Sequence, residues 1–179
     1  HSSHSPYFVE IPAEFLTYLD EEFEARDADP PFLHALAHYE WMELVADTSR
    51  EEFPRSGMDP EGDLGRGIPV VSPLVHVLGY HWPVHPIAAD YQPEAPLEEP
   101  VWLVVYRDRA DEVRFLEINA VTARLLELLR ENDERSGQQV LEQIAAELGA
   151  QDPAPIVDFG LETLENLRGR DIVAGTLLR

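Results

Sequence analysis

The spacing of apolar residues in the second half of the chain predicts a β-hairpin. Val101–Tyr106 is a run of β-branched and aromatic residues, and Val113–Ile118 is a second run in which polar residues interrupt the apolar ones. The polar loop Asp108–Glu112 joins the two runs. Two runs of this kind, connected by a short polar loop, are typical of antiparallel strands joined by a turn.

Apolar residues then recur at helical spacing, and three helices are predicted after the hairpin. Asn119 is the candidate N-cap of the first, and Ser136 with Gln139 fits a capping box at the start of the second. Gly149 is expected to end that second helix, because glycine adopts the left-handed conformation without steric cost. Asp152-Pro153 pairs an N-cap with a proline in the first turn, so a third helix is expected there.

The third predicted helix directs Val157, Leu161 and Leu164 toward the core. Gly169 is expected to end it, and Ile172–Leu177 is suited to a returning strand. A hairpin followed by three short helices is the outline of a winged-helix-like domain. Such domains bind either nucleic acid or a peptide, so the fold alone does not choose between these functions.

The first half of the chain is predicted to contain two helices and one strand. The helices are expected around Phe15–Phe23 and over Phe32–Thr48, and Val70–Tyr80 is expected to be the strand. The predicted fold class is therefore α+β: an N-terminal helical segment, a small antiparallel sheet and a winged-helix-like C-terminal domain with three helices. A proline- and glutamate-rich linker at about residues 92–100 divides the chain into residues 1–99 and 100–179.

The chain is strongly acidic. It has 35 Asp and Glu residues against 13 basic residues, all of them Arg, and a net charge of -22. This charge argues against nucleic acid as the partner of this fragment, since a phosphate backbone needs a positive surface. The third predicted helix carries Asp158, Glu162 and Glu165, whereas a helix that enters a DNA groove carries the opposite charge.

The composition also limits the chemistry that the chain can perform and the cellular compartment in which it is expected. Cysteine is absent, which excludes disulfides, thiolate metal sites and Cys nucleophiles. No apolar run is long enough for a membrane span and no signal peptide is visible, so a cytoplasmic protein without a membrane partner is expected. The chain begins at His1 rather than Met, so it is expected to be a fragment from which an N-terminal domain is missing.

Two pairs of histidines are candidate ligands. His34 and His38 lie four residues apart on the second predicted helix and point to one side, but no H-E-x-x-H pattern and no third ligand accompany them. His81 and His85 belong to the cluster His81–Pro86, in which proline makes the backbone rigid. Structural histidines are the preferred interpretation, so no metal and no cofactor is predicted; a further role for either pair stays open.

Several segments together resemble the C-terminal portion of the HvfC/BufC-type family of peptide-maturation partner proteins. The most specific are Leu36–Trp41, which reads Leu-Ala-His-Tyr-Glu-Trp, and Trp82–His85, which reads Trp-Pro-Val-His. The other segments are Ser5–Phe8, Glu10-Ile11, Glu14–Leu16, Pro31–Leu33 and Trp102–Asp108. Family members usually begin with a helical domain labelled as DNA-binding, which is expected to be the domain missing here.

The resemblance implies a non-catalytic role in the maturation of a ribosomally made, post-translationally modified peptide, as in methanobactin-type biosynthesis. The implied partners are the precursor peptide and a TIM-barrel multinuclear iron oxygenase that modifies Cys residues of that peptide. The iron and the chemistry would then belong to the oxygenase. The residues expected to form the docking face are Tyr39, Trp41, His81, Trp82 and His85, since aromatic residues are enriched at interfaces.

Val101–Arg179 also resembles the small PqqD-like domains that capture leader peptides. In these domains the leader adds as a strand to a sheet edge and lies against the third helix, so main-chain hydrogen bonds give affinity and side-chain pockets give specificity. Carried onto this chain, the edge is Val113–Ile118 and the helix is Ile156–Leu167. The implied peptide-binding residues are Val113, Arg114, Phe115, Leu116, Glu117, Ile118, Val157, Leu161 and Leu164. The alternative is that they only form the core of the domain.

Two other functions stay open from the sequence. One is a transcriptional regulator whose DNA-binding domain is missing from this fragment. The other is a free-standing enzyme, which ranks last because the sequence contains no evident nucleophile–base pair, metal triad or phosphate-binding loop.

Overall fold

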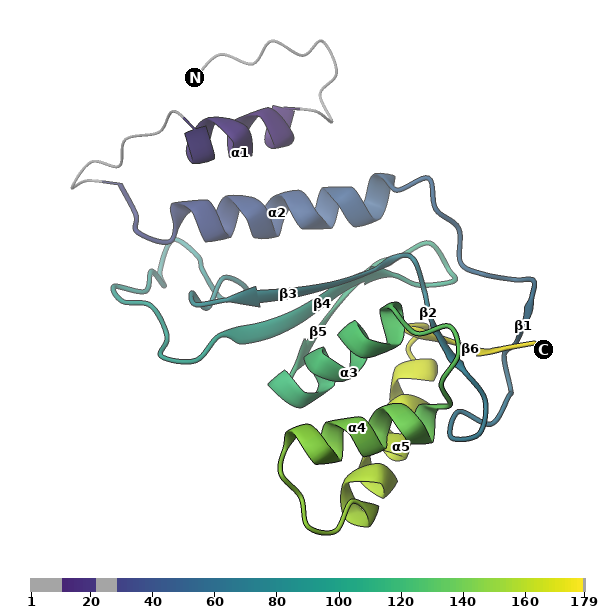
Figure 1. Ribbon diagram of the computed structural model, residues 1–179. Helices are drawn as coiled ribbons and strands as arrows, with labels where there is room; N and C mark the ends of the chain where they lie inside the picture. Colours follow the sequence, from purple (N-terminus) through teal and green to yellow (C-terminus); the bar gives the residue numbers. More distant parts are fainter. Residues whose placement is uncertain (1–10, 22–28, 179) are drawn as a thin grey trace.

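The computed structural model describes residues 11–21 and 29–178. Within these residues it contains five helices and two three-stranded antiparallel sheets (Figure 1), which confirms the predicted α+β class. Ser5–Phe8, Glu10, Phe23 and Arg179, which enter the predictions above, lie outside the described residues. No helix in the described part of the chain is long and apolar enough to cross a membrane.

The N-terminal segment forms two helices. α1 spans Ile11–Glu21 and α2 spans Leu33–Thr48, which is one residue shorter than the predicted second helix. α1 packs against α2, and α2 in turn covers one face of a sheet (Figure 1).

The sheet under α2 consists of three strands in the order β3-β4-β5. β4 (Val101–Arg107) and β5 (Val113–Ile118) form the predicted hairpin, which is confirmed. β3 spans Val75–Tyr80 and pairs with β4 so that Tyr80 lies opposite Val101. The predicted division of the chain near residue 100 therefore falls between two paired strands of one sheet.

The second sheet has the order β1-β6-β2 and joins distant parts of the chain. β1 spans Met58–Asp59, β2 spans Pro69–Val71 and β6 spans Val173–Leu177. β6 confirms the predicted returning strand, but the single strand predicted over Val70–Tyr80 is wrong, because β2 and β3 belong to different sheets. The reason is local: Pro73 has no N–H to donate to a ladder, and Ser72 forms a turn in which its backbone oxygen and its Oγ accept the N–H groups of Val75 and Leu74.

Three helices follow the hairpin: α3 (Ala120–Arg130), α4 (Gly137–Glu147) and α5 (Ala154–Arg168). Asn119 caps α3 by accepting the N–H of Thr122 at 2.8 Å, and Ser136 and Gln139 form the predicted capping box of α4. Gly149 has the positive φ of 70° that was expected after α4. Local signals thus predicted the starts of α3 and α4 and the end of α4. At α5 the N-cap is Pro153 rather than the predicted Asp152, although the Asp152 side chain accepts the N–H of Ala154 at 3.1 Å.

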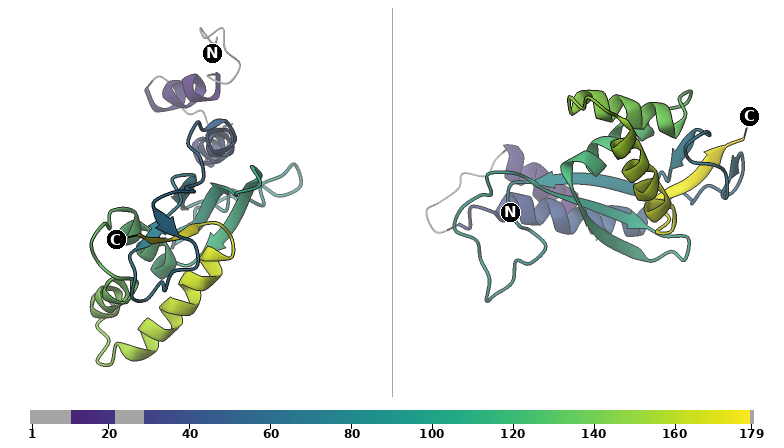
Figure 2. Two further views of the ribbon diagram at one scale, coloured as in Figure 1. Left: turned by 90° about the vertical axis from the view of Figure 1, so that its right-hand side faces the viewer. Right: turned by 90° about the horizontal axis from the view of Figure 1, so that it is seen from below.

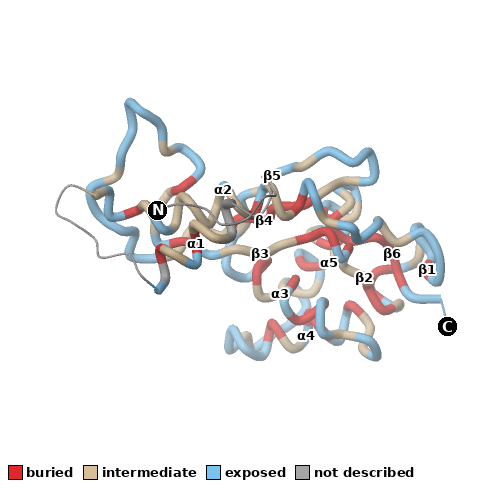
Figure 3. Tube along the Cα trace, turned by 90° about the horizontal axis from the view of Figure 1, so that it is seen from above, coloured by how far each residue is buried: buried red, intermediate tan, exposed pale blue. Residues whose placement is uncertain are grey.

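The sheet β3-β4-β5 separates two hydrophobic clusters. The main cluster lies between this sheet, the second sheet and the helices α3–α5, and it includes the fully buried residues Val104, Val140 and Leu164. The smaller cluster lies on the α2 side and consists of Tyr80, Val84 and Leu103 with their neighbours. Figures 1 and 2 show α2 and the three C-terminal helices on opposite faces of the sheet, and Figure 3 shows that β4 between them is mostly buried.

Candidate functional site

The strand β5 is an edge of its sheet. It pairs with β4, and no other strand of the described chain pairs with it. The N–H of Asp108 donates to the carbonyl of Glu112 across the turn, and hydrogen-bonded pairs alternate along an antiparallel ladder. The backbone groups of Val113, Phe115 and Glu117 therefore point away from β4, toward the open side of the edge.

The side chains of β5 divide between the two faces of the sheet. Phe115 contacts the Tyr39 ring on α2 with 5.6 Å between ring centroids, and Glu117 lies 3.7 Å from His85. On the other face, Leu116 and Ile118 pack against the main hydrophobic cluster. Arg114 donates to Asp108 and to Glu112, so its guanidinium is held at the hairpin turn.

The predicted residues of α5 belong to the hydrophobic cluster on this side of the sheet or pack against it. Val157 and Leu161 are partly buried against the same cluster as Leu116 and Ile118. Leu164 is 0% exposed, so its side chain belongs to the core rather than to a surface that is open to a peptide. Sequence reasoning missed Phe159, which is 65% exposed on α5. Its place outside the apolar stripe of that helix is the signal that identifies it as a surface residue.

The five residues predicted to dock a partner gather around the smaller cluster. Tyr39 and Trp82 pack against it, and the Trp82 ring meets the buried Phe32 ring with 6.1 Å between centroids. Trp41 lies beside His38, whose Nδ1 hydrogen bonds the Tyr80 hydroxyl at 2.8 Å.

The two remaining docking candidates, His81 and His85, are exposed at the edge of this region. His81 Nδ1 lies 3.2 Å from the carbonyl oxygen of Leu97 in the loop before β4, and His85 is the neighbour of Glu117 on β5. The docking candidates and the β5 edge are therefore adjacent parts of one surface.

Burial is the largest cause of the raised pKa values of two phenols in this region, Tyr80 and Tyr39. Burial raises the pKa of Tyr80 well above its usual range, with a smaller contribution from Tyr39. Burial also raises the pKa of Tyr39, followed by the negative charges of Glu43 and Glu40. Both phenols are therefore neutral hydrogen-bonding groups at physiological pH. No group of three or more His, Asp or Glu residues in the described chain is arranged to hold a metal ion.

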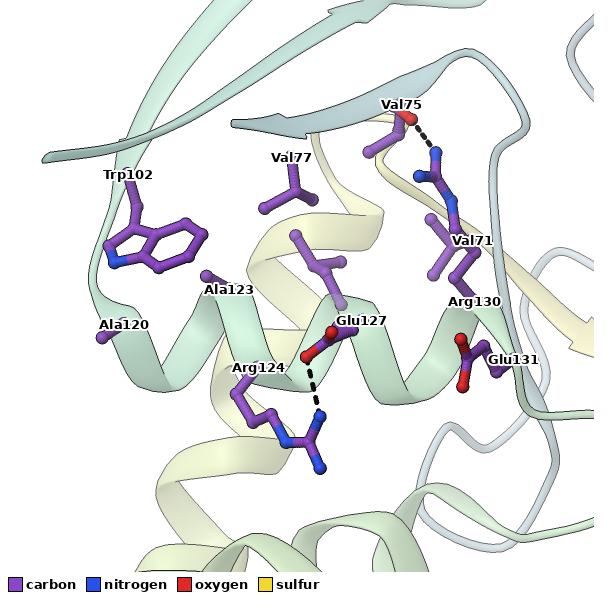
Figure 4. Close-up of a pocket in the computed structure, with 11 residues that line it drawn as sticks. Val71, Val75, Val77, Trp102, Ala120, Ala123, Arg124, Glu127, Arg130 and Glu131 are labelled. Atoms are coloured by element: carbon purple, nitrogen blue, oxygen red, sulfur yellow. Dashed lines mark hydrogen bonds and ion pairs between the residues drawn. The ribbon is translucent and has the colours of Figure 1, made fainter. Parts of the chain in front are cut away.

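A cavity of about 440 Å³ lies on the opposite side of the sheet, between β3 and α3 (Figure 4). Its walls are mainly apolar, with Val75 and Val77 from β3, Trp102 from β4 and Ala123 from α3. On its polar rim Arg124 pairs with Glu127, and Arg130 donates to the carbonyl of Val75. Such a lining suits an apolar side chain and offers no nucleophile–base pair.

Sequence reasoning missed this cavity. The small side chains of Ala120 and Ala123 leave room on α3, but only the position of Trp102 above that helix encloses the space.

Comparison with known families decides the classification. The family model of the HvfC C-terminal domain matches residues 72–168. The chain belongs to this family. The match runs from the turn before β3 to the last residue of α5, so the sheet β3-β4-β5 and the helices α3–α5 make up the matched HvfC unit. No curated protein matches the chain. Membership of the HvfC family indicates a role in a system that matures ribosomally made, modified peptides.

Proposed function

We propose that this HvfC-family chain is a non-catalytic partner protein that binds a precursor peptide and docks on a TIM-barrel multinuclear iron oxygenase. In this proposal, the β4–β5 hairpin and the helices α3–α5 act together as a winged-helix-like peptide-recognition unit in the cytoplasm. The peptide adds as a strand to β5, and the oxygenase contacts the surface around Tyr39, Trp82 and His85. Iron and peptide chemistry are supplied by the oxygenase, so the chain itself needs no cofactor.

The observation that supports this proposal most is the open edge of β5. The outward N–H and C=O groups of Val113, Phe115 and Glu117 are the groups that a further strand needs for pairing. On one face of the edge lie the partly buried apolar side chains of Leu116 and Ile118, which pack against the same hydrophobic cluster as Val157 and Leu161 of α5. They suit alternate apolar side chains of an added strand.

A regulator that binds DNA through this fragment has less support. The helix that would enter a groove in a winged-helix protein is α5, and its exposed residues include Asp158, Glu162 and Glu165. The negative carboxylates of this helix would face the negative phosphates of the DNA, and this repulsion opposes binding.

The proposal is tested by a pull-down of the tagged chain from its source cells, with mass spectrometry of the proteins and peptides that it retains. The expected result is recovery of an iron-containing TIM-barrel protein and a small Cys-containing peptide. Recovery of neither, with DNA retained in a salt-sensitive way, would overturn the proposal in favour of the regulator.

Two matched variants make the pull-down specific for the edge. Glu117→Pro removes an outward N–H without removing a hydrogen bond to β4, because proline is tolerated on an edge strand. Glu117→Ala removes the same side chain and keeps the N–H. The peptide should be lost with the proline variant and retained with the alanine variant, whereas equal recovery with both would exclude strand addition at β5.

The docking surface is tested separately by a double substitution of the exposed residues His81→Ala and His85→Ala. Loss of the oxygenase with retention of the peptide is the expected result. Retention of both would remove these two histidines from the docking face.

A further inference from the structure

An acidic groove lies beside the Val113 end of β5. It is open to solvent, has a volume of about 700 Å³, and is formed by one side of α2 together with the β4–β5 turn. Glu40, Glu43 and Asp47 follow one another at helical spacing along α2, so they share one face of that helix. The lining residues are Glu40, Glu43, Leu44, Asp47, Asp111, Glu112 and Val113.

Arg107 is the nearby cation that the structure places at the Asp47 end of this groove, and its guanidinium donates to the backbone carbonyl of Asp47 rather than to a carboxylate of α2. Asp111 lies 3.7 Å from Arg107, and Glu112 pairs with Arg114. In the described residues no ion pair joins Glu40, Glu43 or Asp47 to an arginine. Among the described residues, these carboxylates are also not part of any group of three or more acidic or histidine side chains that could hold a metal ion. Charge that is spread along a helix in this way suits several cationic side chains better than one ion.

The groove and the open edge of β5 are one surface. Val113 belongs to both, and Phe115 on the same face of β5 contacts Tyr39 on α2. Side chains of an added strand alternate between the two faces of the sheet. Those beside Val113, Phe115 and Glu117 point to the α2 side, and those beside Leu116 point to the opposite face, where Leu116 and Ile118 pack against the main hydrophobic cluster.

We propose that the peptide segment bound at β5 carries Lys or Arg at the alternate positions that face α2, and apolar residues at the positions on the opposite face, beside Leu116 and Ile118. This inference rests on the proposed function, and it names the class of peptide: an extended segment that is basic on one side and apolar on the other. Charge complementarity with Glu40, Glu43 and Asp47 and the unpaired edge of β5 together select this occupant.

The test uses three fluorescein-labelled nine-residue peptides and the whole chain. The peptides alternate Val with Lys, with Gln or with Glu, and binding is followed by fluorescence anisotropy at low and moderate salt. An exposed ion pair contributes about two- to fivefold in affinity, so the Lys peptide should bind about tenfold or more tightly than the Gln peptide. The preference should decrease at moderate salt, because salt screens exposed charges.

Two triple variants with the same change of net charge locate the effect. Glu40→Gln, Glu43→Gln and Asp47→Asn together should remove most of the preference for the Lys peptide. Glu131→Gln, Asp133→Asn and Glu142→Gln together change exposed acids at the α3–α4 region, on the other side of the sheet, and should leave the preference in place. An equal loss in both variants would mean that the preference reflects only net charge, and would overturn the inference.

Failure of the inference and failure of the proposed function give different results. Equal binding of the Lys and Glu peptides to the unmodified chain, with loss of both in Glu117→Pro, overturns the basic segment but retains the strand at β5. Binding that Glu117→Pro leaves unchanged, or no binding of any of the three peptides, contradicts strand addition itself.

Discussion

The Arg107 guanidinium donates from Nη1 to the backbone carbonyl of Asp47 at 2.8 Å, and thereby joins the last turn of α2 to β4. Its Nη2 also donates to the carbonyls of Ser49 and Glu51 at 3.0 and 2.8 Å. Carbonyls at the end of a helix lack internal donors, and a positive charge there is favourable. Arg107 thus holds α2, and with it the acidic groove, above β5.

We expect Arg107→Ala to lower the free energy of unfolding by about 2–3 kcal/mol, because three backbone acceptors lose a charged donor at once. Arg107→Lys should have an intermediate effect, since one ammonium cannot reproduce the planar fork. Urea denaturation measures both. The control is Arg66→Ala, whose side chain is 90% exposed and should change stability by no more than about 0.5 kcal/mol. An equal loss in the control would contradict a specific role for Arg107.

Leu164 and Phe159 on α5 should respond in opposite ways to truncation. Leu164 is fully buried, so Leu164→Ala should destabilise the fold by about 2–5 kcal/mol through lost burial and a cavity. Phe159 is 65% exposed, so Phe159→Ala should stay within about 0.5 kcal/mol of the unmodified chain. Thermal and urea unfolding of the two variants give the comparison, and a large effect of Phe159→Ala would show that this ring is covered in solution.

Gly160 allows α4 and α5 to approach closely. A Cβ at this position would lie 2.2 Å from Cδ2 of the buried Leu141, so Gly160→Ala should cost about 1–3 kcal/mol by overpacking. Gly169→Ala is the matched control, because its Cβ would meet nothing nearer than 3.5 Å and its φ of -60° suits alanine. The control should be neutral or slightly stabilising in urea denaturation. Similar losses for both variants would refute the packing explanation.

The ion pair between Arg124 and Glu147 links α3 to α4. It makes the stability of the fold depend on pH in the acidic range. Nε and Nη2 of Arg124 donate to the two oxygens of Glu147 at 3.0 Å each. These bonds, followed by the one from Gln143, lower the pKa of Glu147 to about 2. The unfolded chain binds the proton more readily, so this contribution to stability is present above the unfolded pKa of about 4.3 and is lost as the pH falls toward about 2.

An NMR titration of the Glu147 side-chain carboxyl carbon checks this directly. Arg124→Gln should move the pKa of Glu147 up toward its ordinary value. Arg66→Gln should leave the pKa of Glu147 unchanged, because Arg66 interacts with Asp63 instead. A pKa of Glu147 that does not respond to Arg124→Gln would assign the shift to another cause.

Local chemistry in the sequence was enough to predict many of the elements. Asn119, Ser136 and Gly149 act on the backbone within a few residues of themselves, and the structure confirms each of these caps. The hairpin was predictable for the same reason, since the polar turn and its flanking runs are adjacent. Pro73 was a local signal as well: a proline inside the run from Val70 to Tyr80 is the feature that separates β2 from β3.

The sequence by itself determined the class of the fold, the hairpin, the three helices after it with the caps of α3 and α4, and the family resemblance, because each depends on neighbouring residues or on a short motif. Tertiary structure alone decided the pairing of β1 and β2 with β6 and the placement of α2 over the sheet. It also placed Glu43 and Val113, which lie far apart along the chain, in the lining of the same groove. Such relationships depend on which apolar faces bury one another, and the spacing of residues within one element does not contain that information.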